Sequence, residues 1–199
     1  ILPQHAGIGE LRILGHALAN LAAQGRWLAW IAPPYLPYAP ALQAAGIDAR
    51  WIAADCAKEA DIRRLADETL QRMGPVDILV NNAGVNDGVG LSAGPAAFQQ
   101  SLQRNLLHYY GMAHYAADFL KQARGSIVNI GSKVCETGQG GTSGYAASKG
   151  AINALTREWA VELAPAGVRV NAVLPAETWT PLYERCLAEM PDPVAARAA

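Results

Sequence analysis

The sequence predicts an α/β fold in which helices cover both faces of a doubly wound parallel sheet. Two observations carry this prediction. From residue 50 onward, short apolar segments alternate with longer amphipathic ones, as parallel strands alternate with crossover helices. The chain of 199 residues is also 51% hydrophobic, which is enough for one domain with a sizeable core.

Seven segments make up the alternating part of the chain. We expect four strands, at residues 50–54, 76–81, 126–131 and 168–174. We expect three helices between them, at residues 58–73, 95–122 and 144–164. Each strand is a short apolar run and each helix a longer periodic segment. Their order is that of consecutive parallel strands joined by helices.

Residues 1–48 show a different pattern from the alternating segments that follow them. Residues 11–24 predict a helix that stops at a glycine, and residues 26–32 predict a strand that leads into a proline-rich loop. We therefore expect a single α/β domain over residues 1–199. Within it, residues 1–48 form an atypical helix–strand unit, and residues 49–199 form a body that is truncated at its carboxyl end.

Composition argues against several classes of protein. The net charge is −1, which gives no electrostatic reason to bind nucleic acid or an anionic membrane. No apolar run reaches the length that crosses a bilayer. Cys56, Cys135 and Cys186 are widely scattered and lack the spacing of a metal site. Free thiols indicate a reducing compartment, so we expect a cytoplasmic protein without a metal.

One pair of residues predicts proton-transfer chemistry. Tyr145 and Lys149 are four residues apart in a predicted helix, so both lie on the same face of it. A free phenol has a pKa of about 10 and is a poor base at neutral pH. A neighbouring ammonium favours the phenolate and lowers that pKa. Ser132 ends a predicted strand upstream and offers a hydroxyl that can share the substrate. Taken alone, the pair is weak evidence, because many helices carry it by chance as a solvated contact.

Further motifs occur in a fixed order around this pair. An apolar strand runs into Asn81-Asn82-Ala83-Gly84, another delivers Ser132, and Tyr145-x-x-x-Lys149 follows. On these motifs residues 49–195 resemble the short-chain dehydrogenase/reductase family. The resemblance implies a Rossmann-like doubly wound parallel sheet. It also implies an NAD(P)-dependent oxidoreductase that transfers a hydride between the nicotinamide and a secondary alcohol or carbonyl.

The resemblance assigns four catalytic residues. Tyr145 is implied to be the general acid and base, and Lys149 to lower its pKa and bind the nicotinamide ribose. Ser132 is implied to hydrogen-bond the substrate oxygen. Asn105 matches a helix asparagine that anchors a water in the proton relay. The protein would then contribute the orientation of substrate and cofactor and the transfer of the proton.

The resemblance also implies which residues hold the cofactor, NAD or NADP. They lie at the ends of predicted strands or on the catalytic helix: Asp55, Asn82, Ala83, Gly84, Tyr145, Lys149, Pro175 and Thr180. The residue that follows the second family strand would choose between NAD and NADP. Residues 32–35 at that place include no acid and no arginine, so the sequence leaves both cofactors open.

The opening motif of the family is altered in this chain. Its glycine-rich turn lets the backbone approach a pyrophosphate at a helix N-terminus. Gly7-Ile8-Gly9 fits the second half of that turn, but Pro3 stands where an earlier glycine belongs and has no N–H. We therefore expect the first strand, which the family places between its second and fourth strands, to be missing or replaced. We expect the same of the carboxyl-terminal strand.

The sequence around the predicted pocket is similar to the sequences of the L-fucose dehydrogenase branch of that family. A sugar needs hydrogen-bonding partners, and Glu136, Gln139 and Glu177 flank the expected pocket. The alternative is that these three side chains face solvent. The resemblance implies a sugar or related polyol as substrate, and a homodimer or homotetramer that pairs through the helices at 95–122 and 144–164.

A second resemblance opens alternatives of another class. Gly9-Glu10-Leu11 and the segments at 25–34 and 44–48 make residues 1–48 similar to RecA-like SOS-response proteins that include SulA. The chain could accordingly be a non-catalytic RecA/SulA-like interaction protein. It could also be a chimeric fragment that is unable to bind cofactor, with its seam near residues 48–50.

Overall fold

The structure is a computed structural model. It describes residues 20, 23–24, 28–29, 49–50, 52–176, 184, 188 and 192. Most of the predicted helix at 11–24 and most of the strand at 26–32 therefore lie outside the described residues. Glu177 and Thr180 also lie outside them. No helix within the described part combines the length and the apolar character that crossing a membrane requires.

A parallel three-stranded sheet forms the centre of the described body. Its strands are β3 (Ile78–Asn81), β4 (Ser126–Ile130) and β5 (Arg169–Val173), in the order β3-β4-β5. Asn81 lies opposite Asn129 in the register of β3 and β4. Because all three strands are parallel, their carboxyl ends meet at one edge of the sheet. The residues that follow each strand are thereby brought together.

Two short strands form a separate parallel pair. They are β1 (Leu28–Ala29) and β2 (Ala49–Arg50). Cα atoms of β1 come within 8 Å of those of β3, yet within the described residues the two ladders do not join. Residues 1–19 lie outside the described part, so the loss of the first family strand stays a prediction. The predicted strand at 50–54 is also shorter than expected, since residues 52–54 are irregular.

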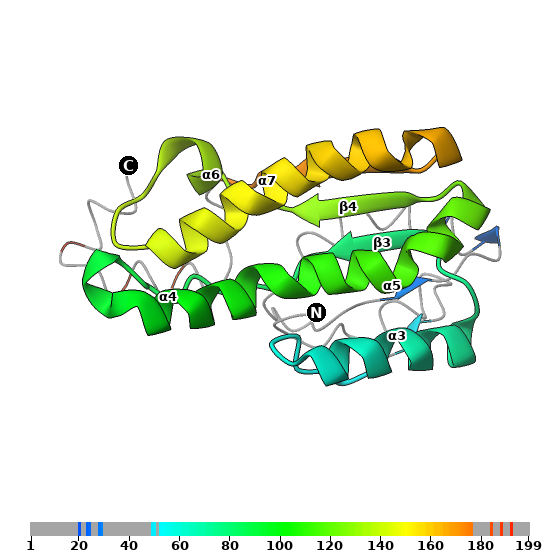
Figure 1. Ribbon diagram of the computed structural model, residues 1–199, viewed down its shortest axis with the longest axis horizontal. Coiled ribbons are helices and arrows are strands. Elements are labelled where there is room, and N and C mark those ends of the chain that lie inside the picture. Colours follow the sequence, from blue (N-terminus) through cyan, green and yellow to red (C-terminus); the bar gives the residue numbers. More distant parts are fainter. Residues whose placement is uncertain are drawn as a thin grey trace, which may run out of the picture.

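Three long helices run side by side across the front of the sheets in Figure 1: α3 (Glu59–Met73), α5 (His108–Ala123) and α7 (Ser143–Leu163). The neighbour of α3 is α5, while α7 packs against β5 and against α4 (Gly94–Leu102). Three short helical turns lie between the longer elements: η1 (Leu91–Ala93), α6 (Val134–Thr137) and η3 (Ala164–Ala166). Two of the three predicted helices, at 58–73 and 144–164, agree with α3 and α7 to within about a residue at each end.

The third predicted helix is not a single regular helix. Between α4 and α5 lies η2 (Gln103–Leu107), a π-helical segment. A π turn inserts an extra residue into the helical ladder and rotates the side chains that follow it. Asn105 is in this segment and is fully buried. Helical residues nevertheless continue without a break from Gly94 to Ala123, so the predicted helix at 95–122 is confirmed, and the π-helical segment around Asn105 is what the sequence did not predict.

The core lies between the sheet and these helices. Leu120, Ile127 and Ile152 are fully buried there. A chain of polar side chains crosses the same core, because Asn129 accepts a hydrogen bond from Asn81 (3.0 Å) and donates one to Thr156 (2.9 Å). Each buried amide is thus partnered, as burial requires. The chain joins β3, β4 and α7 in one register.

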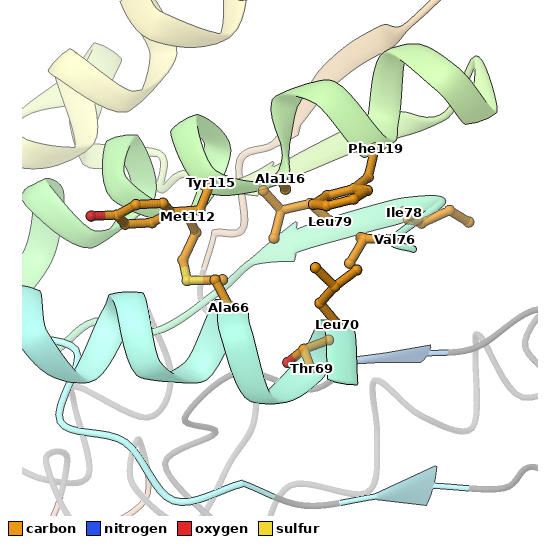
Figure 2. Close-up of a pocket in the computed structure, with 10 residues that line it drawn as sticks. All are labelled: Ala66, Thr69, Leu70, Val76, Ile78, Leu79, Met112, Tyr115, Ala116 and Phe119. Atoms are coloured by element: carbon orange, nitrogen blue, oxygen red, sulfur yellow. The ribbon is translucent and has the colours of Figure 1, made fainter. Parts of the chain in front are cut away.

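A small apolar cavity lies between α3, α5 and β3 (Figure 2). Its volume of about 20 Å³ is room for about one water molecule. The lining is Ala66, Thr69, Leu70, Val76, Ile78, Leu79, Met112, Tyr115, Ala116 and Phe119. It offers almost no groups that could bind a polar ligand, and it lies beneath helices rather than at the carboxyl ends of the strands. We interpret it as a packing defect.

Gly125 joins α5 to β4 in a space without room for a side chain. Its N–H donates to Leu120 O (2.9 Å), and a Cβ on it would overlap the carbonyl oxygen of Asp77. Gly125→Ala should therefore lower the free energy of unfolding by about 2–4 kcal/mol through overpacking against backbone. Urea denaturation measures the loss. Gly150→Ala is the control, since its Cβ meets open space inside α7; a similar loss in both variants would contradict the argument.

His108 is a buried histidine whose protonation should govern acid stability. Its Nε2 donates to Ala83 O (2.8 Å), and the side chain is 1% exposed. Burial lowers its pKa to about 4, so between pH 6.5 and 4 the unfolded chain binds a proton that the folded chain does not. Stability from this group is present above pH 6.5 and is lost toward pH 4, by about 3 kcal/mol.

His108→Gln keeps a donor for the Ala83 carbonyl and removes the titration. The variant should lose about 3 kcal/mol less than the unsubstituted protein between pH 6.5 and 4, as followed by urea denaturation across that range. His114→Gln on the same helix is the matched control, because His114 is exposed. Equal pH slopes in the His108 variant and the unsubstituted protein would show that His108 does not set acid stability.

Candidate active site

The candidate site is at the edge where the strands end. β3 ends at Asn81 and continues into the turn Asn82–Gly84, while β4 ends at Ile130 and is followed by Ser132. The parallel register places both ends at the same edge of the sheet. Loops at this edge of an open α/β sheet are where such folds bind ligands.

The first two turns of α7 bring Tyr145 and Lys149 to this edge. The hydroxyl of Ser132 hydrogen-bonds to the phenol of Tyr145, and Lys149 Nζ lies 5.6 Å from the centroid of the Tyr145 ring. Ser132 and Tyr145 are half-buried, whereas Lys149 is only 3% exposed. The structure therefore brings three of the four predicted catalytic side chains together at this edge of the sheet, with Lys149 Nζ near the Tyr145 ring rather than bound to its hydroxyl.

Lys149 makes its shortest contacts with groups that the sequence did not single out. Its Nζ donates to Ile130 O (2.7 Å) and to the hydroxyl of Tyr109 (3.3 Å). Tyr109 in turn donates to the same Ile130 carbonyl (2.9 Å). Burial of the ammonium lowers the pKa of Lys149 to about 8, because a charge is costly away from water.

The pKa of Tyr145 shifts opposite to the sequence prediction. Lys149 was expected to lower it, but burial raises it, and the hydrogen bond from Ser132 offsets this only in part. The physical reason is that the ammonium of Lys149 is bound by Ile130 and Tyr109 rather than turned fully toward Tyr145. The expectation of a lowered phenol pKa is therefore wrong in this structure.

Asn105 supports the turn after β3. Its Oδ1 accepts a hydrogen bond from Val85 N (2.7 Å), and its Nδ2 donates to Ser101 O (3.1 Å). A Cβ on Gly84 would lie 3.2 Å from Asn105 Oδ1 and 3.6 Å from Lys149 Nζ. The turn, the buried asparagine and the lysine thus meet at one place, so the fourth predicted catalytic residue belongs to the same cluster.

The predicted cofactor residues are distributed less compactly. Asn82, Ala83 and Gly84 form the turn beside the cluster. Asp55 is exposed after β2, and its contacts are local, with Ala57 N (3.0 Å) and Lys58 (3.2 Å), which lower its pKa. Pro175 follows β5, and its carbonyl accepts a hydrogen bond from Lys133 N (3.0 Å).

Two of the predicted substrate residues are described, and both are exposed. Glu136 Oε1 accepts a hydrogen bond from Asn153 Nδ2 (2.8 Å), and Gln139 Oε1 accepts one from Asn86 Nδ2 (3.5 Å). Both follow Ser132 in the chain, in and after α6. Their carboxylate and carboxamide groups keep further hydrogen-bonding capacity, since each is only partly occupied by these partners.

Three side chains that contact the cluster, those of Asp87, Ser101 and Tyr109, were not predicted from the sequence. Asp87 Oδ1 accepts a hydrogen bond from Ser101 Oγ (2.9 Å), and Ser101 is fully buried beneath Asn105. Tyr109 follows Asn105 by four residues, as Asn105 follows Ser101. That spacing was the available signal, because residues four apart share a helix face. His108, the residue before Tyr109, is also buried, and its Nε2 donates to the Ala83 carbonyl.

Comparisons with known proteins agree with this geometry. The family profile described as short chain dehydrogenase matches residues 8–190. L-fucose dehydrogenase from Bos taurus is 40% identical over 143 residues, which cover 71% of this chain and 53% of that protein. The enzyme of the same name from Mus musculus is 40% identical over 145 residues, which cover 72% of this chain and 53% of that protein. The chain spans about half the length of these curated relatives.

Solved structures give the same result for the fold. The crystal structure of Cj0485 dehydrogenase superposes with a TM-score of 0.82 at 36% identity, covering 96% of this chain and 72% of that one. The NADH-dependent reductase A1-R' complexed with NAD gives 0.71 at 27% identity, covering 82% of this chain and 73% of that one.

The family match also includes most of residues 1–48, so the resemblance of that segment to RecA-like proteins gains no support from these matches. Three findings agree on the family: the order of the motifs, the parallel sheet, and the profile match over residues 8–190. The chain belongs to the short-chain dehydrogenase family.

Proposed function

We propose that this protein is an NAD(P)-dependent oxidoreductase that moves a hydride between a nicotinamide and a secondary alcohol or its carbonyl. The observation that carries the proposal is the clustering of Ser132, Tyr145 and Lys149 at the carboxyl ends of β3 and β4. A hydroxyl, a phenol and an ammonium at one strand edge are the groups that a proton transfer beside a hydride transfer requires.

Each side chain has a distinct part in the proposed reaction. During oxidation Tyr145 accepts the proton of the substrate hydroxyl, and during reduction it returns that proton to the carbonyl oxygen. Ser132 hydrogen-bonds the same oxygen and holds it against the phenol. Asn105 keeps the turn at Val85 in place and, by family resemblance, anchors a water in the proton relay. When bound, the nicotinamide supplies the hydride acceptor or donor.

The described residues fit the nicotinamide end of such a cofactor. An ammonium has three N–H donors, and Lys149 uses two of them on Ile130 O and Tyr109, so one remains for a ribose hydroxyl. Gly84 beside it is exposed and has no side chain in the way. Fit at the pyrophosphate end depends on residues 1–19, which lie outside the described part, so both NAD and NADP belong in the test.

A sugar such as L-fucose is the proposed substrate. Two relatives at 40% identity carry the name L-fucose dehydrogenase. The exposed Glu136 and Gln139 follow Ser132 on the same loop and can accept or donate hydrogen bonds to sugar hydroxyls. Glu177, the third proposed substrate residue, lies beyond the described range.

The same proposal places the protein in the cytoplasm as a homodimer or homotetramer. Cys56 and Cys135 are free thiols in the described part of the chain, as a reducing compartment permits. Large apolar side chains on η2, α5 and α7 are exposed, namely Leu107, Tyr110 and Val161. Their positions on these helices are the support for pairing through them.

Tyr145→Phe tests the proposed chemistry. Removal of the phenolic hydroxyl should lower kcat/KM for L-fucose by about 10²–10⁴-fold, the usual contribution of a general acid or base. Cofactor affinity, measured by NADH and NADPH fluorescence, should fall much less than kcat/KM, because phenylalanine keeps the ring and Lys149 remains. Reduction of NAD and of NADP is followed at 340 nm. Tyr110→Phe, an exposed tyrosine on α5, is the matched control and should retain full activity.

Three outcomes separate the possibilities. Saturable cofactor binding together with activity that depends on Tyr145 supports the oxidoreductase. A folded protein that binds neither NADH nor NADPH would contradict the function and favour a fragment that has lost its cofactor site. Binding without oxidation of L-fucose, but with oxidation of another polyol, would overturn only the substrate.

A further inference from the structure

Tyr109 is a fully buried tyrosine that contacts the proposed catalytic lysine from another helix. Its hydroxyl lies 3.3 Å from Lys149 Nζ and 2.9 Å from Ile130 O, while Nζ lies 2.7 Å from the same carbonyl. These three atoms form a closed triangle of hydrogen bonds. The ammonium also lies 5.3 Å from the centroid of the Tyr109 ring, within cation–π range.

We propose that Tyr109 is a positioning residue for Lys149, whose hydroxyl holds the lysine ammonium against the carbonyl at the end of β4. The proposal deepens the proposed function, because it concerns the residue expected to bind the nicotinamide ribose. It differs from the roles of Ser132, Tyr145 and Asn105, since Tyr109 would act through Lys149 without touching substrate or cofactor.

The direction of each hydrogen bond in the triangle is fixed by chemistry. A carbonyl oxygen only accepts, so the single O–H of Tyr109 donates to Ile130 O. The lone pairs of the phenolic oxygen are then free to accept from Lys149, which only donates. Burial raises the pKa of Tyr109, so the phenol keeps its proton and this arrangement at neutral pH.

The triangle matters because, among the residues that the structure describes, no anion compensates the buried ammonium. The groups that face it are Tyr145 on its own helix, Cys135 on α6, and His108 and Tyr109 on α5. Burial raises the pKa of both tyrosines and of Cys135 and lowers that of His108, so all four are neutral at pH 7. Glu136 on α6 is exposed and bound to Asn153.

Hydrogen-bond acceptors therefore keep Lys149 charged and in place. A buried charge needs such partners, and the loss of one disfavours the protonated form. Tyr109 and the Ile130 carbonyl are two acceptors that the structure gives to this ammonium. Without the Tyr109 hydroxyl, the ammonium would lose one acceptor and the constraint that directs it to the end of β4.

One turn of α5 would thus position two parts of the site. His108 packs edge-on against Tyr109, with ring centroids 4.8 Å apart, and holds the Ala83 carbonyl of the turn after β3. Tyr109 holds Lys149 at the end of β4. The spacing between the turn and the lysine would then follow from two adjacent residues of a single helix.

The titration of Lys149 in the free protein tests the proposal. The chain has four lysines, Lys58, Lys121, Lys133 and Lys149, so ¹³C-lysine NMR gives few resonances, and Lys149→Arg identifies the one of interest. Tyr109→Phe keeps the ring and removes the hydroxyl. Its Lys149 midpoint should fall by about one pH unit relative to the unsubstituted protein, the scale of a lost hydrogen bond to a charge.

Tyr110→Phe, the adjacent and exposed tyrosine, is the control and should leave the Lys149 midpoint unchanged. A midpoint that also stays unchanged in Tyr109→Phe, or that rises, would overturn the proposal. Should Tyr109→Phe not fold, the same titration is made on Tyr109→Leu, in which a Lys149 midpoint that does not fall would overturn the proposal. The measurement needs neither cofactor nor substrate, so its failure is distinguishable from failure of the proposed function.

Discussion

The burial of the Lys149 ammonium at the edge of the sheet is the constraint on which the rest of the site depends. A charge that is 3% exposed requires acceptors close to it. The acceptors come from two separate elements: the last carbonyl of β4 and a hydroxyl from α5. The start of α7, the end of β4 and the first turn of α5 must therefore stay in fixed relative positions. That requirement links local hydrogen bonds to the arrangement of the whole described body.

The π-helical segment η2 makes this arrangement possible. It precedes α5 directly and contains Asn105, whose amide holds the turn after β3. The two residues that follow η2 are His108 and Tyr109. His108 hydrogen-bonds to the same turn, and Tyr109 hydrogen-bonds to Lys149. A side chain at position 84 would crowd this place, since a Cβ there would lie 3.2 Å from Asn105 Oδ1 and 3.6 Å from Lys149 Nζ. Polar contacts in a low-dielectric interior thus place the groups that the proposed hydride-transfer chemistry needs.

The order of strands and helices and the meeting of Ser132, Tyr145 and Lys149 could be predicted from the sequence. Parallel strands bring their carboxyl ends together whatever the details of packing, and an i, i+4 pair shares a helix face. The π turn, the short helix α6 and the partners of Lys149 could not. They depend on contacts between residues far apart in the chain, such as Tyr109 and Lys149. The pKa of Tyr145 was predicted in the wrong direction for the same reason, because burial is not readable from spacing.

The most direct test of a buried ammonium is the stability of Lys149→Met as a function of pH. Burial lowers the pKa of Lys149 to about 8 in the folded protein, against about 10.5 when unfolded. Between these values the unfolded chain binds a proton that the folded chain does not, so the unsubstituted protein gains stability as pH rises. The methionine variant lacks this gain. Its advantage in unfolding free energy should therefore shrink by about 3 kcal/mol from pH 8 to 10.5, measured by urea denaturation. A stability difference that does not change with pH would contradict the account.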